Sequence, residues 1–141
     1  MNKFQKAYAV AKAQYDVAAQ SYRQAFNGHS EYGTLFEKQE SLLDSEEGTP
    51  EYEECLAIEG RIMEIENEID ERTCYTASRE ALKTAEESLV RWSFEALKKR
   101  PAVFLKVGVK YSDIEVLLPH MDNFYSPIRK RLVDLAFHFA G

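Results

Sequence analysis

Five carboxylates lie within eight consecutive residues near the middle of the sequence, and this density suggests metal or acid–base chemistry. They are Glu64, Glu66, Glu68, Asp70 and Glu71. Di-iron helical bundles pair inward-facing glutamates with a histidine three positions later, and no glutamate of this chain has that partner. We therefore interpret these carboxylates as a solvated acidic face available to a partner, and we expect no catalytic residue.

The histidines and cysteines are too scattered to suggest a metal centre. No pair among them has the spacing of zinc ligands, and the sequence holds no glycine-rich phosphate loop, nucleophile elbow or HExxH motif. Cys55 and Cys74 are 19 residues apart, which is about 28 Å along one straight helix and too far for a disulfide within it. We expect no enzyme, no metal and no cofactor, with a disulfide between two copies as an alternative for the cysteines.

A cationic triplet near the C-terminus is the candidate anion-binding site. Arg129, Lys130 and Arg131 fall in the first turn of an expected helix, where the helix dipole disfavours cations. This helix and a short one expected over residues 113–118 resemble a DNA-reading helical pair. However, their connection, residues 119–125, is longer than the usual turn. We expect the triplet to pair with the acidic segment of the chain rather than with nucleic acid.

The elements that must position these side chains are helices. Residues 51–99 contain no proline and one glycine, and they carry two apolar stripes in steps of three and four. The stripes are Cys55, Ile58, Ile62, Ile65 and Ile69, then Leu82, Ala85, Leu89, Trp92 and Ala96. At about 100° per residue, the second stripe falls on nearly the opposite side from the first. We expect one continuous helix through residues 73–78, with a break there as the alternative.

Residues 2–26 predict an amphipathic helix whose seam alternates aromatic residues with alanine. The seam is Phe4, Tyr8, Ala11, Tyr15, Ala18, Tyr22 and Ala25. Alanine lets a neighbouring helix approach closely, and tyrosine fills the remaining space with its hydroxyl at the wet edge. We interpret this seam as core within the fold rather than as a surface for a foreign partner.

Capping patterns predict where the remaining helices begin and end. Thr34 and Glu37 match a capping box that would open a short helix of about residues 35–47. Thr49 and Pro50 start the long stretch, and residues 126–127 start the last helix. Residues 103–111 alternate in hydropathy as a strand does, but the sequence contains no second strand pattern. A connector is expected there, with pairing to another chain's edge as the alternative.

These elements predict an all-α protein, an elongated antiparallel helical hairpin or bundle built on the long helix of about 51–99. A small helical C-terminal cap, residues 100–141, completes a single domain of 141 residues. No run of 18 apolar residues suggests a membrane span. The N-terminus lacks the apolar core of a signal peptide, so we expect a cytoplasmic protein.

The acidity of the chain is local. Residues 31–75 carry 15 acidic and three basic residues, a net charge of −12, whereas residues 1–30 have a net charge of +3. We expect a non-catalytic protein–protein interaction module, an adaptor or regulator. The alternative is an inhibitor whose acidic face competes with nucleic acid for a basic site on a partner. A nucleic-acid-binding helical protein is the third possibility.

The isoleucine stripe predicts self-association. Burial of Ile58, Ile62, Ile65 and Ile69 would contribute on the order of 2 kcal/mol each, and the first helix is also needed by the second apolar stripe. The short helix alone would then cover part of the seam, so we expect a second copy to cover the rest. A symmetric dimer is the simplest assembly, although isoleucine at both seam positions also suits trimers and tetramers.

Overall fold

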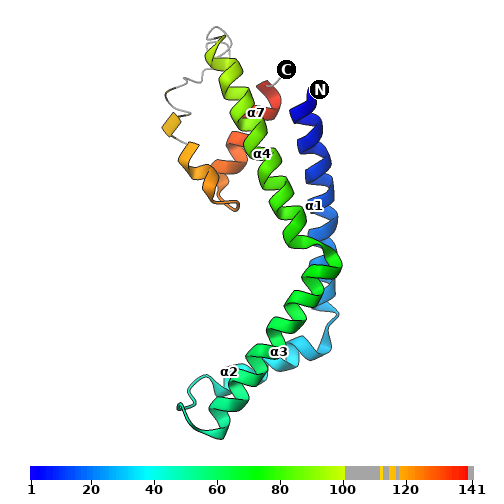
Figure 1. Ribbon diagram of the computed structural model, residues 1–141, viewed down its shortest axis with the longest axis vertical. Coiled ribbons are helices and arrows are strands. Elements are labelled where there is room, and N and C mark those ends of the chain that lie inside the picture. Colours follow the sequence, from blue (N-terminus) through cyan, green and yellow to red (C-terminus); the bar gives the residue numbers. More distant parts are fainter. Residues whose placement is uncertain (101–111, 113–114, 117, 140–141) are drawn as a thin grey trace. The chain divides into compact units, whose positions relative to one another are not determined.

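The computed structural model describes residues 1–100, 112, 115–116 and 118–139, and all the regular elements in this part are helical (Figure 1). They are α1 (Lys3–Asn27), α2 (Ser30–Leu42), α3 (Pro50–Thr73), α4 (Tyr75–Lys98), the 3₁₀ helix η1 (Leu118–Asp122) and α7 (Pro127–Phe139). The all-α prediction is confirmed. The strand-like residues 103–111 lie outside the described residues.

The chain divides into two compact units. The terminal unit comprises residues 1–14 and 78–141, and the middle unit comprises residues 15–77. The division therefore does not follow the expected boundary after residue 99. The single-domain assignment stays a prediction.

In the middle unit, the isoleucine stripe is covered by the chain itself. Ile58, Ile62, Ile65 and Ile69 are all buried, with Ile65 at 0% exposure, and α2 packs against α3. The expectation that a second copy must cover this stripe is wrong, because the middle unit supplies enough apolar surface to bury it. The stripe therefore provides no free interface for self-association.

The start of α2 differs from its prediction, whereas the start of α3 agrees. α2 begins at Ser30, and the ring nitrogen Nδ1 of His29 accepts the backbone N–H of Tyr32 at 3.2 Å. Thr34 lies inside the helix and its hydroxyl donates to Ser30 O at 3.1 Å, so the expected capping box is absent. Thr49 caps α3 as predicted, since its hydroxyl accepts the N–H of Tyr52 at 3.3 Å.

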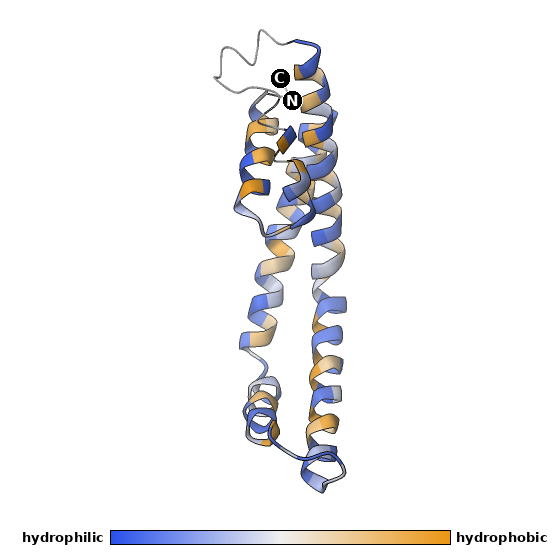
Figure 2. Ribbon diagram, turned by 90° about the vertical axis from the view of Figure 1, so that its left-hand side faces the viewer, coloured by the Kyte–Doolittle hydropathy of each residue, from blue (hydrophilic) through white to orange (hydrophobic). Residues whose placement is uncertain are grey.

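The long stretch is two helices rather than one, which corrects the expectation of continuity. α3 ends at Thr73, Cys74 adopts a left-handed conformation (φ 56°, ψ 30°), and α4 begins at Tyr75. A single left-handed residue ends a helix because it turns the chain out of the helical path. On either side of the break the two stripes contribute buried residues, which are Ile58, Ile62, Ile65 and Ile69 on α3 and Leu82 and Leu89 on α4. The hydropathy alternates along each of the two helices in Figure 2.

Substitutions at Cys74 should reveal the energetic cost of this break. A left-handed conformation costs an L-residue about 1–2 kcal/mol, and asparagine tolerates it better than most residues. We expect Cys74→Asn to raise the midpoint of urea unfolding. β-Branched Cys74→Val should lower stability by about 1 kcal/mol, because its side chain fits this conformation poorly. Equal midpoints for the two variants would contradict a left-handed residue at this position.

The core of the terminal unit joins α4 to η1 and α7. Its buried members are Leu89, Val90, Phe94, Leu97, Met121, Leu132, Val133 and Ala136. The hydroxyl of Ser93 donates to Ala136 O at 3.0 Å, and the side-chain amide of Gln5 donates to Phe137 O at 2.7 Å. α1, α4 and α7 thus share one core.

The aromatic–alanine seam of α1 is confirmed as core within the fold. In the terminal unit, Phe4 stacks on Trp92 with ring centroids 5.5 Å apart. In the middle unit, the ring of Tyr22 stacks on that of Tyr75 at 4.3 Å. Ala11 and Ala18 are buried between these aromatic positions, as the seam pattern predicted.

Candidate functional site

The five carboxylates singled out in the sequence do not form one uniform face. The carboxylate of Glu66 accepts the Tyr32 hydroxyl at 3.1 Å, and that of Glu64 accepts Nη1 of Arg61 at 3.1 Å. Asp70 accepts the backbone N–H of Thr76 at 2.8 Å. The other two, Glu68 and Glu71, are exposed. The face therefore combines structural contacts with solvated charge.

Arg61 is the centre of an ion-pair network between α2 and α3. Its guanidinium contacts the Glu31 carboxylate through two hydrogen bonds of 2.9 and 3.1 Å, and Glu68 lies 3.9 Å away. The hydrogen bond to Arg61 lowers the pKa of Glu31, and the pKa of Arg61 is raised mainly by Glu31 and then by Glu64. These groups are solvent-exposed, so their ion pairs contribute little to stability. We infer that they orient α2 on α3.

Tyr32 is tied to α3 through Glu66. Burial, followed by the hydrogen bond to the Glu66 carboxylate, raises the pKa of Tyr32 to about 12. The tyrosine is therefore a neutral hydrogen-bond donor at ordinary pH. Its role here is to join α2 to α3, and it offers no base or nucleophile.

Asp70 and Glu71 are neighbours with different expected roles, which provides a matched pair. Asp70 caps α4 by accepting the Thr76 N–H, and loss of such a cap typically costs about 1 kcal/mol. We expect Asp70→Ala to lower the free energy of unfolding by about that amount. The exposed Glu71→Ala should change it by less than about 0.5 kcal/mol. Urea unfolding followed by circular dichroism measures both; equal losses would show that Asp70 does not act as a cap.

The cationic triplet is split by the fold, which corrects its assignment as one anion-binding site. Arg129 is 1% exposed, and its Nε donates to the Glu86 carboxylate at 2.7 Å. Its Nη1 donates to Met121 O, and its Nη2 donates to Lys83 O at 3.2 Å. Lys130 and Arg131 remain exposed.

Arg129 therefore serves the core of the terminal unit and is not available to an external anion. Its partner carboxylates come from α4, with Glu87 3.7 Å from Nη1, rather than from the acidic segment 31–75. Burial raises the pKa of Glu86, and the hydrogen bond and charge of Arg129 act in the opposite direction. The guanidinium also lies 5.6 Å from the ring centroid of Phe124.

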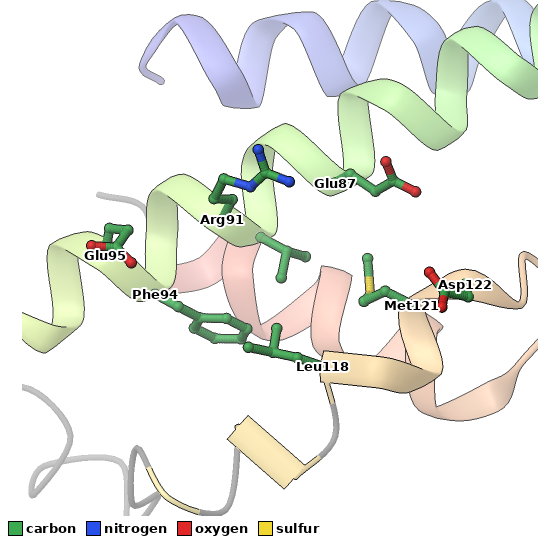
Figure 3. Close-up of a pocket in the computed structure, with 8 residues that line it drawn as sticks. Glu87, Arg91, Phe94, Glu95, Leu118, Met121 and Asp122 are labelled. Atoms are coloured by element: carbon green, nitrogen blue, oxygen red, sulfur yellow. The ribbon is translucent and has the colours of Figure 1, made fainter.

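A cleft of about 330 Å³ lies beside α4 and η1 in the terminal unit (Figure 3). Phe94 lies beside Leu118, with Glu87 and Asp122 toward one end and Glu95 toward the other. Carboxylates and a single arginine, Arg91, surround the apolar part. This mixture of charges favours neither an anionic nor a cationic ligand. The lining of the cleft also lacks a nucleophile with an adjacent base.

A larger open groove of about 920 Å³ lies between α1 and α4 of the terminal unit. Small and apolar side chains line it, among them Ala7, Val10, Ala11, Ala81, Ala85 and Ser88. Val10 is 58% exposed. Lys3 and Lys6 lie at the α1 side of the groove and Glu80 at the α4 side, where Glu80 is 3.7 Å from Arg79.

This groove faces away from α7. Val10 lies about 160° around α1 from Tyr8, whose ring contacts Phe137 of α7. Ser88 lies about 140° around α4 from Ser93, which bonds to Ala136 of α7. The α1–α4 pair thus buries one side against α7 and leaves a second apolar side uncovered among the described residues. On α1 this uncovered side follows Lys3, Ala7 and Val10, in steps of four and three beside the seam. It was the sequence signal that was missed.

No family model, no curated protein and no solved structure matches this chain. Across residues 1–100 and 118–139, the structure contains no cluster of three or more histidine, cysteine or acidic side chains placed to hold a metal ion. None of the helices described is both long and apolar enough to cross a membrane.

Proposed function

We propose that this chain is a non-catalytic protein–protein interaction module and that the groove between α1 and α4 is its binding face. The observation that carries the proposal is the uncovered apolar surface of this groove, in which Val10 is 58% exposed. Adaptor or regulator roles, and the cytosolic location expected from the sequence, belong to the same proposal.

The lining of the groove suits an α-helix. A helix with one apolar face binds in such a groove through side chains spaced three, four and seven residues apart. Small side chains on both walls, such as Ala7, Ala81 and Ala85, let a third helix approach closely. The bound helix would complete a second helix-packed face of the α1–α4 pair.

The charges around the groove favour an acidic helix. Lys3 and Lys6 lie along the α1 wall, and the terminal unit as a whole has 14 basic and 8 acidic residues, a net charge of +6. Such a field favours association with negatively charged partners. The partner that fits best is therefore an amphipathic helix with acidic residues beside its apolar stripe.

Site-specific photo-crosslinking tests this role. A photoreactive residue at position 10 should form protein adducts in the native host, whereas the same residue at position 17 should not. Val17 is the matched control, because it lies on α1 and is also exposed, at 67%, but is outside the groove. Adducts at both positions, or at neither, would overturn the groove as the binding face.

The acidic competitor remains a second candidate because of the charge of the middle unit. It has 16 acidic and 4 basic residues, a net charge of −12, and two of its four cations, Lys38 and Arg61, already pair with its own carboxylates. Such a surface could occupy a basic groove built for nucleic acid. This role predicts salt-sensitive recovery of a nucleic-acid-binding protein that is lost when Glu64, Glu68 and Glu71 are changed to glutamine.

A further inference from the structure

The outer face of α3 carries a second uncovered apolar surface, here named the α3 ridge and formed by Leu56, Gly60 and Met63. Leu56 and Met63 are 45% and 57% exposed. They lie about 160–180° around the helix from Ile65, which is fully buried. The ridge therefore points away from the core of the middle unit, and no helix of the described chain covers it.

Acidic residues border this ridge. Glu53 and Glu59 lie three positions before and three positions after Leu56, so they flank it on the same side of the helix, and both are exposed. The α3 ridge is thus the apolar stripe of an acidic amphipathic helix. This is the chemistry that the groove between α1 and α4 favours.

We propose that the groove of one copy binds the α3 ridge of a second copy of this chain. The inference rests on the proposed binding role of the groove and names its occupant. One chain displays both surfaces, a groove in a unit of net charge +6 and a ridge in a unit of net charge −12. A monomer would leave both apolar surfaces in water, and pairing them covers both.

The spacing of the two surfaces agrees with this docking. Leu56 and Met63 are seven residues apart, about 10 Å along the helix, and Gly60 leaves a gap between them with no heavy atom within 4 Å of an added Cβ. The groove residues Ala81 and Ser88 are also seven residues apart. Two knobs one heptad apart therefore meet a groove with a matching repeat, as in knobs-into-holes packing.

The charges set the side of approach. Lys3 and Lys6 line the α1 wall of the groove, and Glu59 beside the ridge can contact them. On the α4 wall, Glu80 lies next to Arg79, so that wall carries both negative and positive charge. The contact joins two different surfaces, and copies consequently associate head to tail rather than through one self-complementary patch.

Head-to-tail pairing has a specific consequence for variants. Val10→Asp places a carboxylate in the groove and Met63→Asp places one on the ridge, and each should weaken self-association at least tenfold by sedimentation velocity. A mixture of the two should form a complex, because the intact groove of the Met63→Asp chain can take the intact ridge of the Val10→Asp chain. A self-complementary interface would show no such rescue.

Controls use the same substitution at exposed valine and leucine positions outside both surfaces. Val17→Asp, on α1, and Leu43→Asp, exposed at 64%, should associate like the wild type. Raising the salt from about 0.1 M to about 1 M shortens the screening length from about 10 Å to about 3 Å and should weaken association. Circular dichroism of each variant confirms that it is folded.

Three results would overturn the proposal: a monomeric wild type, loss of assembly in the control variants, or no complex in the mixture. These results are distinguishable from failure of the groove itself. If position 10 crosslinks in the host to an acidic helix of another protein while the purified chain is monomeric, the groove keeps its binding role and the second copy is excluded. Crosslinks from position 10 to the peptide containing Leu56 and Met63 support the proposal.

Discussion

Arg129→Ala is expected to destabilise the terminal unit by about 3–5 kcal/mol, because it removes the guanidinium of a largely buried ion pair and with it several hydrogen bonds. The guanidinium is 1% exposed and contacts Glu86, Met121 O and Lys83 O. These groups belong to α4 and η1, while Arg129 belongs to α7. One side chain thus ties three elements together, and its loss leaves two backbone carbonyls without this donor.

The single tryptophan offers a local readout of this effect. Trp92 lies in the terminal unit and stacks on Phe4, so its fluorescence follows unfolding of that unit. Arg131→Ala is the matched control, since Arg131 lies on the same helix but is exposed, and its cost should be below about 0.5 kcal/mol. Arg129→Lys should not restore stability, because an ammonium cannot match the fork of guanidinium donors. Equal midpoints for the two alanine variants would refute the buried position of Arg129.

The pH dependence of stability tests the contribution of Glu86 to its ion pair with Arg129. Burial raises the pKa of Glu86, so the folded state keeps a proton on this carboxyl at a higher pH than the unfolded state does. The stability that Glu86 contributes is therefore present below its unfolded pKa and is lost as the pH rises through its folded pKa. Glu86→Gln should remove this part of the pH dependence. It should cost less than Arg129→Ala, because a glutamine oxygen can still accept Nε of Arg129.

Ile65→Ala is expected to have the second large effect, a loss of about 2–5 kcal/mol in the stability of the middle unit. The side chain is fully buried, and truncation leaves a cavity that its neighbours fill only in part. Met63→Ala, two residues away on the exposed ridge, should cost less than about 0.5 kcal/mol. Urea unfolding followed by far-ultraviolet circular dichroism measures both.

A third variant, Ile62→Asp, decides between burial and assembly for the isoleucine stripe. Because the chain itself covers Ile62 and Ile65, Ile62→Asp should unfold the middle unit rather than dissociate an intact protomer. A folded, monomeric Ile62→Asp chain derived from an oligomeric wild type would return the interface to the stripe. An unfolded middle unit would confirm that the stripe is core.

The amino-acid sequence by itself determined where most helices lie, because the signals involved are local. The seam from Phe4 to Ala25 predicts α1, and Thr49 with Pro50 marks the start of α3 through one hydroxyl and one fixed φ angle. The buried isoleucines follow from steps of three and four along a single helix. Each of these inferences needs only residues within a turn or two of one another.

The sequence also contained the two apolar stripes on opposite sides of one straight helix. It did not indicate that the helix would break between them. A left-handed Cys74 costs only about 1–2 kcal/mol, a difference that local propensity cannot resolve against a continuous helix. The burial of Leu82 and Leu89 on one side of the break and of Ile65 and Ile69 on the other can offset that cost. Tertiary packing therefore decided the break.

Only the tertiary structure decided which charged and apolar side chains are free. The sequence pattern predicts a surface cation at Arg129. In the structure it is buried against the carboxylate of Glu86, which lies 43 residues away in the sequence. Val10 and Met63 are ordinary apolar positions until the packing of α7 and α2 determines which side of each helix is covered. Exposure depends on which elements meet, and that is set by the sum of many weak contacts distant in sequence.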